Sequence, residues 1–180
     1  MQSNIPNLGG CIVFFDFDGV LAPYRATRDK TNIKQEDYIA NAVSYRTLPE
    51  REEKGLSENT LIDMVNYDIY NHLVAPKTFR DIISSLDARS IFGLTTAATS
   101  FELEAKKGFI HKWYPSFLTD NFLFVRKDEY KAKLMQAIYE RRFKGTIPPS
   151  KMVIVDDSVS ILEEAEALGF TAYHNSMFIE

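Results

Sequence analysis

Short apolar runs that recur along the chain constrain its fold more than any other feature of the sequence. Five of them have the length and the residue types of β-strands, and they span residues 11–15, 91–94, 122–125, 152–155 and 171–173. The first four contain no charged residue and have no polar face. Strands without a polar face are typical of a parallel sheet that helices cover on both sides.

Segments with the apolar period of a helix separate most of these runs. They extend from Lys77 to Leu86, from Asp128 to Arg142 and from Ser158 to Gly169. Ser158 is suited to begin the last helix, because serine can bond to the first free amide groups, and Gly169 is suited to end it. The alternation of strands and helices predicts a Rossmann-like α/β fold, a doubly wound parallel sheet.

The chain between the first and second runs is longer than one crossover between parallel strands requires. Such a crossover needs a single helix, which residues 77–86 supply. Residues 24–73 are therefore predicted to form a small helical insertion, a cap that stands over the sheet edge. The core would then consist of residues 1–23 and 74–180.

Charge and composition exclude several classes of function. The 180 residues carry a net charge of −4 and have a pI near 5.5, which argues against a nucleic-acid backbone as the main partner. The one cysteine, Cys11, cannot form an internal disulfide, and its apolar surroundings favour a buried, inert thiol. Residues 1–10 do not resemble a secretory signal, and no apolar stretch is long enough to span a membrane. We therefore expect a cytoplasmic location and no membrane partner.

Polar side chains stand where three of the predicted strands end. They are Asp16 after the first run, Thr95 and Thr96 after the second, and Asp156 and Asp157 after the fourth. Ligands of open parallel sheets bind beyond the carboxyl ends of the strands, which all lie at one edge. Three separate segments of the chain therefore converge on one predicted site.

The acidic residues at this edge favour a bound cation. Asp16 and Asp18 are two residues apart, and Gly19 permits a sharp turn that would direct both carboxylates into the site. Beside Asp156 and Asp157 they would repel one another strongly unless a cation lay among them. Either pair alone could be a solvated turn or a helix cap, but two pairs at strand ends favour a functional site. Ligation by carboxylate oxygens suits Mg²⁺, which would also relieve the repulsion between a carboxylate and a phosphate that it attacks.

Four segments resemble, in the same order, the four signatures of the haloacid dehalogenase (HAD) superfamily. The first is Asp16 to Leu21 (DFDGVL) after an apolar strand, and the fourth is Val153 to Ser158 (VIVDDS). The second is Leu94 to Thr96 and the third is Lys131, and both are less specific. The resemblance extends from Cys11 to about residue 173. It implies the same Rossmann-like core.

The resemblance also implies a role for each matching residue. Asp16 would be the nucleophile that forms an aspartyl-phosphate, and Asp18 would be the general acid and then the general base. Thr95 would hydrogen-bond to the phosphoryl oxygens, and Lys131 would neutralise the charge on Asp16 and on the phosphate. Asp18 favours phosphoryl chemistry, because the magnesium-independent dehalogenases of this superfamily characteristically lack that second aspartate.

A set of magnesium ligands follows from the same resemblance. They would come from Asp16, from the backbone carbonyl of Asp18, and from the pair Asp156 and Asp157. In related sequences the second acid of such a pair is usually the direct ligand. Asp157 is therefore favoured for direct coordination, with Asp156 close behind it.

Two assignments stay open at this point. Thr96 is the alternative to Thr95, which is favoured because it directly follows the apolar run. Lys133 and then Lys127 are the alternatives to Lys131, which is favoured because core residues follow it at helical spacing.

Taken together, these residues predict a HAD-type phosphatase, a magnesium-dependent hydrolase that acts on a phosphate monoester through an aspartyl-phosphate. Its partner would be a small phosphorylated substrate. A phosphotransferase or phosphomutase of the same fold is one alternative, and a catalytically silent binding or regulatory module is the other. The intact acidic residues argue against the silent module, because a retired site tends to lose such clustered charge.

Overall fold

The computed structural model describes residues 5–22, 70, 73–97 and 100–178. Most of the insertion predicted over residues 24–73 lies outside this part of the chain and stays a prediction. Its two described residues, Tyr70 and Leu73, belong to the hydrophobic core. Within the described residues, no helix combines the length and the apolar character needed to cross a membrane.

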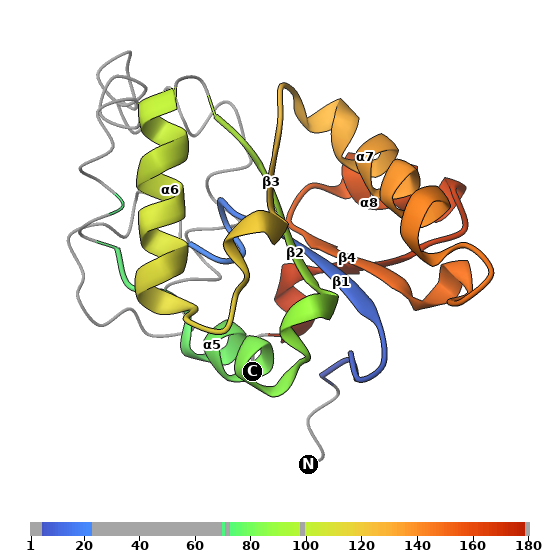
Figure 1. Ribbon diagram of the computed structural model, residues 1–180, viewed down its shortest axis with the longest axis horizontal. Coiled ribbons are helices and arrows are strands. Elements are labelled where there is room, and N and C mark those ends of the chain that lie inside the picture. Colours follow the sequence, from blue (N-terminus) through green and yellow to red (C-terminus); the bar gives the residue numbers. More distant parts are fainter. Residues whose placement is uncertain (1–4, 23–69, 71–72, 98–99, 179–180) are drawn as a thin grey trace.

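A parallel sheet of five strands lies at the centre of the structure (Figure 1). In chain order the strands are β1 (Ile12–Asp16), β2 (Ile91–Thr96), β3 (Phe122–Val125), β4 (Met152–Asp156) and β5 (Thr171–His174). Their order across the sheet is β3-β2-β1-β4-β5. All five predicted strands are therefore present, in the mixed order of a doubly wound fold.

Helices cover both faces of this sheet. On one face lie α5 (Lys77–Ser85) and α6 (Ser100–Trp113), and on the other lie α7 (Lys131–Ile138) and α8 (Val159–Ala167), as Figure 1 shows. Short turns of other helix types complete the described elements: η2 (Ala88–Ser90), η3 (Thr119–Asn121), η4 (Asp128–Tyr130), η5 (Tyr139–Phe143), η6 (Pro149–Lys151) and η7 (Asn175–Phe178). This arrangement confirms the predicted Rossmann-like α/β fold.

Alternate residues of β1 belong to two different hydrophobic clusters. Val13 and Phe15 pack in the cluster shared with α5 and α6, whereas Ile12 and Phe14 pack in the cluster shared with α7 and α8. Phe14 also stacks on Phe92 of β2, with the ring centroids 4.8 Å apart. Successive side chains of a strand point to opposite faces, so a strand covered on both sides has no position for a polar residue.

Two helical segments differ from the prediction. The segment expected to be one helix from Asp128 to Arg142 consists of a 3-10 turn (η4), the α-helix α7 and a π-helical turn (η5). The helix α6 has no counterpart in the prediction. Its buried positions include Glu102 and Lys106, and Gly108 lies in its second half, so its sequence shows no clear apolar stripe.

The strand order places the ends of β1 and β4 side by side. From β1 the chain adds β2 and β3 on one side and then crosses to add β4 on the other side of β1. The crevice beyond the carboxyl ends at such a switch point is where open α/β sheets bind ligands. Asp16 and Asp156, which the sequence placed just after the strands, are the last residues of β1 and β4.

Candidate active site

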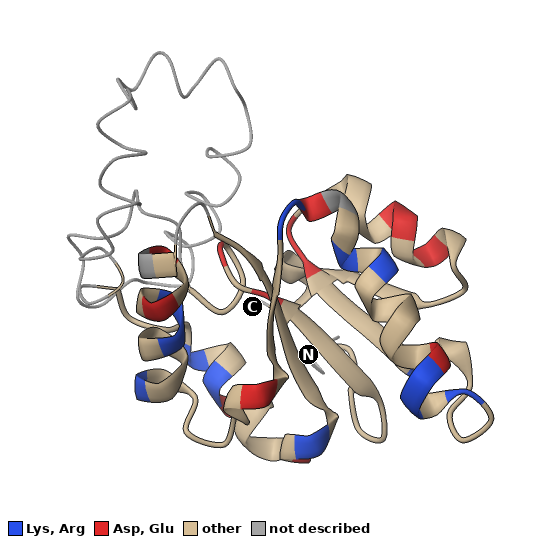
Figure 2. Ribbon diagram, turned by 45° about the horizontal axis from the view of Figure 1, so that its top comes forward, with Lys and Arg blue, Asp and Glu red and all other residues tan. Residues whose placement is uncertain are grey.

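A small pocket of about 190 Å³ opens at the carboxyl edge of β1, β2 and β4. Its lining is mostly charged and consists of Asp16, Asp18, Thr96, Asp128, Lys131, Asp156, Asp157, Ser158 and Ile161. Figure 2 shows the acidic segments that gather at this end of the central strands. The structure thus brings together the acidic residues of the first and fourth signatures, as the sequence predicted.

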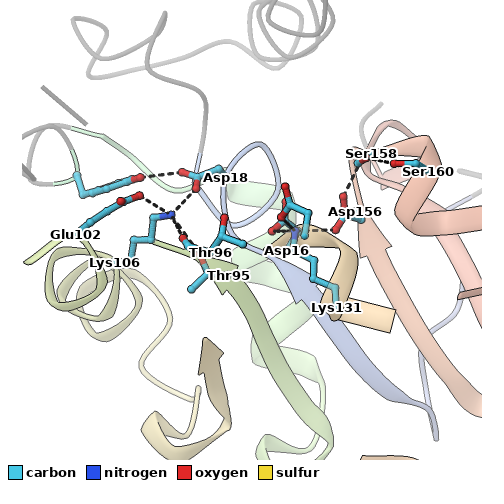
Figure 3. Close-up of polar contacts among 12 residues, drawn as sticks. Asp16, Asp18, Thr95, Thr96, Glu102, Lys106, Lys131, Asp156, Ser158 and Ser160 are labelled. Carbon is cyan, nitrogen blue, oxygen red and sulfur yellow. Dashed lines mark hydrogen bonds and ion pairs between the residues drawn. The ribbon is translucent and has the colours of Figure 1, made fainter. Parts of the chain in front are cut away.

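Lys131 lies at the centre of this pocket's charges. Its Nζ atom is 2.6 Å from Oδ1 of Asp16 and 3.1 Å from Oδ2 of Asp156 (Figure 3). The Lys131 side chain is only 3% exposed, because α7 begins at this residue and directs it under the strand ends. Lys133 and Lys127, the alternatives, are both exposed, and neither lines the pocket.

Three buried carboxylates form a cluster that could hold a metal ion. Asp16, Asp156 and Asp157 each offer an oxygen, and these atoms all lie within 4.8 Å of one another. The two oxygens of Asp156 contact Lys131 and the backbone N–H of Ser158, which donates a hydrogen bond of 2.8 Å. Several oxygen donors and an excess of negative charge are what Mg²⁺ requires, so these residues fit this ion.

Burial and neighbouring charges shift the pKa values of the groups in this cluster. Burial, together with the charge of Asp156, raises the pKa of Asp16 well above its usual value, although Lys131 opposes this. Burial likewise raises the pKa of Asp156, and it raises the pKa of Asp157 to about 7. Burial alone would lower the pKa of Lys131, but Asp16 and Asp156 outweigh it and raise the pKa above 10.5. The acids thus favour protons where a divalent cation would compensate their charge.

Asp18 lines the same pocket, but its carboxylate does not belong to the metal-binding cluster. The Tyr70 hydroxyl donates to Oδ1 of Asp18 at 2.9 Å, and Nζ of Lys106 lies 2.6 Å from Oδ2 (Figure 3). Gly19 directly follows Asp18 and has a φ of 87° that other residues rarely adopt, so the turn at this position depends on glycine. The carboxylates of Asp16 and Asp18 therefore face different partners.

The two threonines of β2 have different surroundings. Thr96 lines the pocket, whereas Thr95 is 1% exposed and is not among the described residues that line it. The Thr95 hydroxyl donates to the Thr96 carbonyl at 3.0 Å, and it lies 3.2 Å from Nζ of Lys106. Thr96, the alternative in the sequence prediction, is thus the threonine on the pocket wall.

Sequence reasoning missed three polar residues at or near the site. Asp128 lines the pocket, with its Oδ1 3.3 Å from Nζ of Lys131, and Lys106 and Tyr70 contact Asp18. Lys106 lies on α6 four residues after Glu102 and three before Phe109, so all three share one helix face. An oppositely charged pair at that spacing is common on exposed helices, so it marked no site. The one available signal was the apolar Phe109 on the same face, which indicates that the face is buried.

No family model and no curated protein matches the sequence. Solved structures do match the fold. A HAD-family enzyme from Bacteroides thetaiotaomicron, described as a complex with magnesium and inorganic phosphate, is 16% identical with a TM-score of 0.44, and the match covers 90% of this chain and 92% of that one. A haloacid dehalogenase-like hydrolase from Streptococcus pneumoniae is 13% identical with a TM-score of 0.49, and the match covers 90% of this chain and 82% of that one.

Proposed function

We propose that this protein is a magnesium-dependent phosphohydrolase that cleaves a phosphate monoester through an aspartyl-phosphate on Asp16. The observation that carries this proposal is the position of the Asp16 carboxylate. Asp16 is the last residue of β1 and lines the pocket. Its Oδ1 atom lies 2.6 Å from Nζ of the buried Lys131, and two further carboxylates lie close to it. A carboxylate held by a cation beside a metal-binding cluster is suited to attack an anionic phosphate.

The reaction proceeds in two steps. An Asp16 oxygen forms a bond to phosphorus as the bond from phosphorus to the alcohol oxygen breaks. Asp18 gives its proton to the departing alcohol, and it then takes a proton from the water that attacks the aspartyl-phosphate. The products are the alcohol and inorganic phosphate, and Asp16 is restored.

Lys131 supports the attack of Asp16 by its charge. It contacts Asp16 directly, and its raised pKa keeps it protonated at neutral pH. A fixed cation at this distance orients the nucleophile and reduces the repulsion between its carboxylate and the incoming phosphate. The Lys131 ammonium group also contacts Asp156, one of the two acidic residues at the end of β4.

Asp16, Asp157 and the backbone carbonyl of Asp18 would hold the magnesium ion. Asp157, which shares the buried carboxylate cluster with Asp16, is proposed as the direct ligand, and Asp156, which contacts Lys131 and Ser158, as the residue behind it. The bound ion would supply charge neutralisation for the transferred phosphoryl group. Hydrogen bonding to that group falls to a threonine of β2, and the presence of Thr96 in the pocket lining supports Thr96 over Thr95.

A phosphotransferase or phosphomutase is the second candidate function, because an aspartyl-phosphate can transfer its phosphoryl group to an alcohol as well as to water. The two are distinguished by the fate of the group. If added alcohols, and not water, accept the phosphoryl group from the aspartyl-phosphate, the protein is a transferase.

Replacing Asp16 with asparagine tests the proposal. Wild-type protein with Mg²⁺ should release inorganic phosphate from p-nitrophenyl phosphate or from members of a panel of phosphorylated metabolites. Asp16→Asn should retain the fold, as judged by circular dichroism, and should lose turnover. Wild-type turnover in this variant would contradict the aspartyl-phosphate mechanism. A wild-type protein that binds Mg²⁺ and hydrolyses no member of the panel would instead be a silent binding module.

A further inference from the structure

Lys106 is a fully buried charged side chain beside the pocket, with 1% of it exposed. Its Nζ atom lies 2.6 Å from Oδ2 of Asp18, 2.9 Å from Oε1 of Glu102 and 2.6 Å from the carbonyl oxygen of Thr96. It also lies 5.3 Å from the centroid of the Phe17 ring. Every one of these partners is negative or electron-rich, so Lys106 is held as a cation in a site built around it.

The energetic cost of this arrangement argues against a purely structural role. Burial alone would lower the pKa of Lys106, but the charges of Asp18 and Glu102 outweigh it and raise the pKa. Buried ion pairs can often be replaced by apolar residues of similar volume without loss of stability. The face of α6 that carries Lys106 also carries Phe109, which packs against Phe17, so methionine would serve packing on this face equally well.

Both oxygens of the Asp18 carboxylate are held from outside its own segment. Lys106 of α6 binds Oδ2, and the Tyr70 hydroxyl donates to Oδ1 at 2.9 Å. With an oxygen held at each side, rotation of the carboxylate about its bond to the chain is restricted. Each carboxylate oxygen has two acceptor positions, so each also keeps a lone pair for a proton or a substrate oxygen.

We propose that Lys106 is a positioning residue which, with Tyr70, holds the Asp18 carboxylate in the orientation that proton transfer to the leaving alcohol requires. This inference rests on the proposed function, in which Asp18 is the general acid. When Asp18 gives up its proton, the carboxylate that forms lies next to the Lys106 ammonium group, which stabilises it. Lys106 therefore acts on the reaction through Asp18.

The leaving group of the substrate gives a readout that a merely structural role would not affect. Nitrophenolate departs from p-nitrophenyl phosphate without a proton, whereas the alkoxide of an aliphatic phosphate monoester requires one. The ratio kcat/KM reports only the steps up to formation of the aspartyl-phosphate, so it separates alcohol departure from the later attack by water. Loss of a positioned acid should therefore lower kcat/KM selectively for the aliphatic monoester.

The variant to test is Lys106→Met combined with Glu102→Gln, which removes the cation without leaving the Glu102 charge opposite methionine. We expect kcat/KM to fall about a hundredfold for the aliphatic monoester and less than about threefold for p-nitrophenyl phosphate. Tyr70→Phe removes only a hydroxyl group. It should also lower kcat/KM more for the aliphatic monoester than for p-nitrophenyl phosphate, but by a smaller factor than the double variant does. Lys107→Met is the matched control, because Lys107 is the next residue of α6, is only half-buried and pairs with Glu104.

Each result supports or overturns the inference. Equal losses for the two substrates, or no loss, would overturn it while leaving the proposed function intact. If the double variant does not fold, Tyr70→Phe decides, and equal effects of that variant on both substrates overturn the inference. If the wild-type protein hydrolyses neither monoester, or if Asp16→Asn remains active, the proposed function fails and this inference fails with it.

Discussion

The Nζ atom of Lys131 lies 2.6 Å from Oδ1 of Asp16, although 115 residues separate the two in the chain. Lys131 is the first residue of α7 and Asp16 is the last residue of β1. The contact thus joins the beginning of a helix on one face of the sheet to the carboxyl end of a central strand. This contact brings the proposed nucleophile and a buried cation into one site.

Replacing Lys131 with methionine should reduce kcat/KM about a hundredfold or more, because it removes a fixed charge from the site of phosphoryl transfer. Steady-state kinetics with p-nitrophenyl phosphate would measure this change. Lys133→Met is the matched control, since Lys133 is exposed two residues away on the same helix and its Nζ lies over the Tyr130 ring. Equal activities of the two variants would show that the buried lysine does not assist the reaction.

Exchange of single carboxylates should distinguish the ligands of the metal. Asp156→Asn should weaken Mg²⁺ binding about ten- to hundredfold, because Asp156 is proposed to act behind the direct ligand. Asp157→Asn should weaken it more, because Asp157 is proposed to coordinate the ion directly. Isothermal titration calorimetry of the metal-free protein measures both. Asp120→Asn is the control, because Asp120 is exposed on η3 and does not line the pocket. Unchanged affinity in both pocket variants would argue against a metal site at this edge.

The strands and the acidic edge could be predicted because they depend on local patterns. A run that is apolar on both faces leaves few alternatives to a covered parallel sheet, and residues that end parallel strands lie at one edge. Lys131 could be selected because Met135, a buried residue, follows it one helical turn later. The sequence pattern therefore sufficed to predict that Asp16, Asp156 and Lys131 lie close together.

The partners of Asp18 could not be predicted, because they depend on contacts between distant segments. Lys106 is 88 residues from Asp18, and Tyr70 is 52 residues from it. The helix that carries Lys106 buries charged residues, so its apolar period is weak and the helix itself escaped prediction. The sequence also could not show that Thr96 lines the pocket whereas Thr95 does not, for another reason. Successive strand residues face opposite sides, so an error of one residue in the strand end exchanges the two side chains.

Gly93 of β2 should be more sensitive to substitution than Gly108 of α6. A Cβ atom at Gly93 would lie 2.4 Å from a ring carbon of buried Phe122, so Gly93→Ala should destabilise the protein by about 1–3 kcal/mol. At Gly108 nothing lies within 4 Å of such an atom, and Gly108→Ala should stabilise the helix by about 0.5–1 kcal/mol. Urea unfolding of the two variants measures these changes. If Gly93→Ala were as stable as the wild type, β2 and β3 would not pack this closely.

The stability of the metal-free protein should fall as pH rises from about 4 to about 7. Burial raises the pKa of Asp157 from its usual 3.8 to about 7. In this window the unfolded chain has lost the Asp157 proton and the folded protein retains it. The folded state therefore binds more protons, and the contribution of Asp157 to the free energy of unfolding decreases with pH until it levels off above about pH 7.

Mg²⁺ should reverse this trend, because the ion binds ionised carboxylates and replaces the protons. Thermal unfolding with a chelator and with Mg²⁺ would then show a larger stabilisation by the metal at about pH 8 than at about pH 5. Asp157→Asn isolates the contribution of this carboxyl, since the variant should lose stability less steeply between these pH values without metal. Parallel pH profiles for this variant and the wild type would mean that Asp157 ionises in the folded protein as it does in the unfolded chain, which would contradict the predicted effect of this carboxyl on stability.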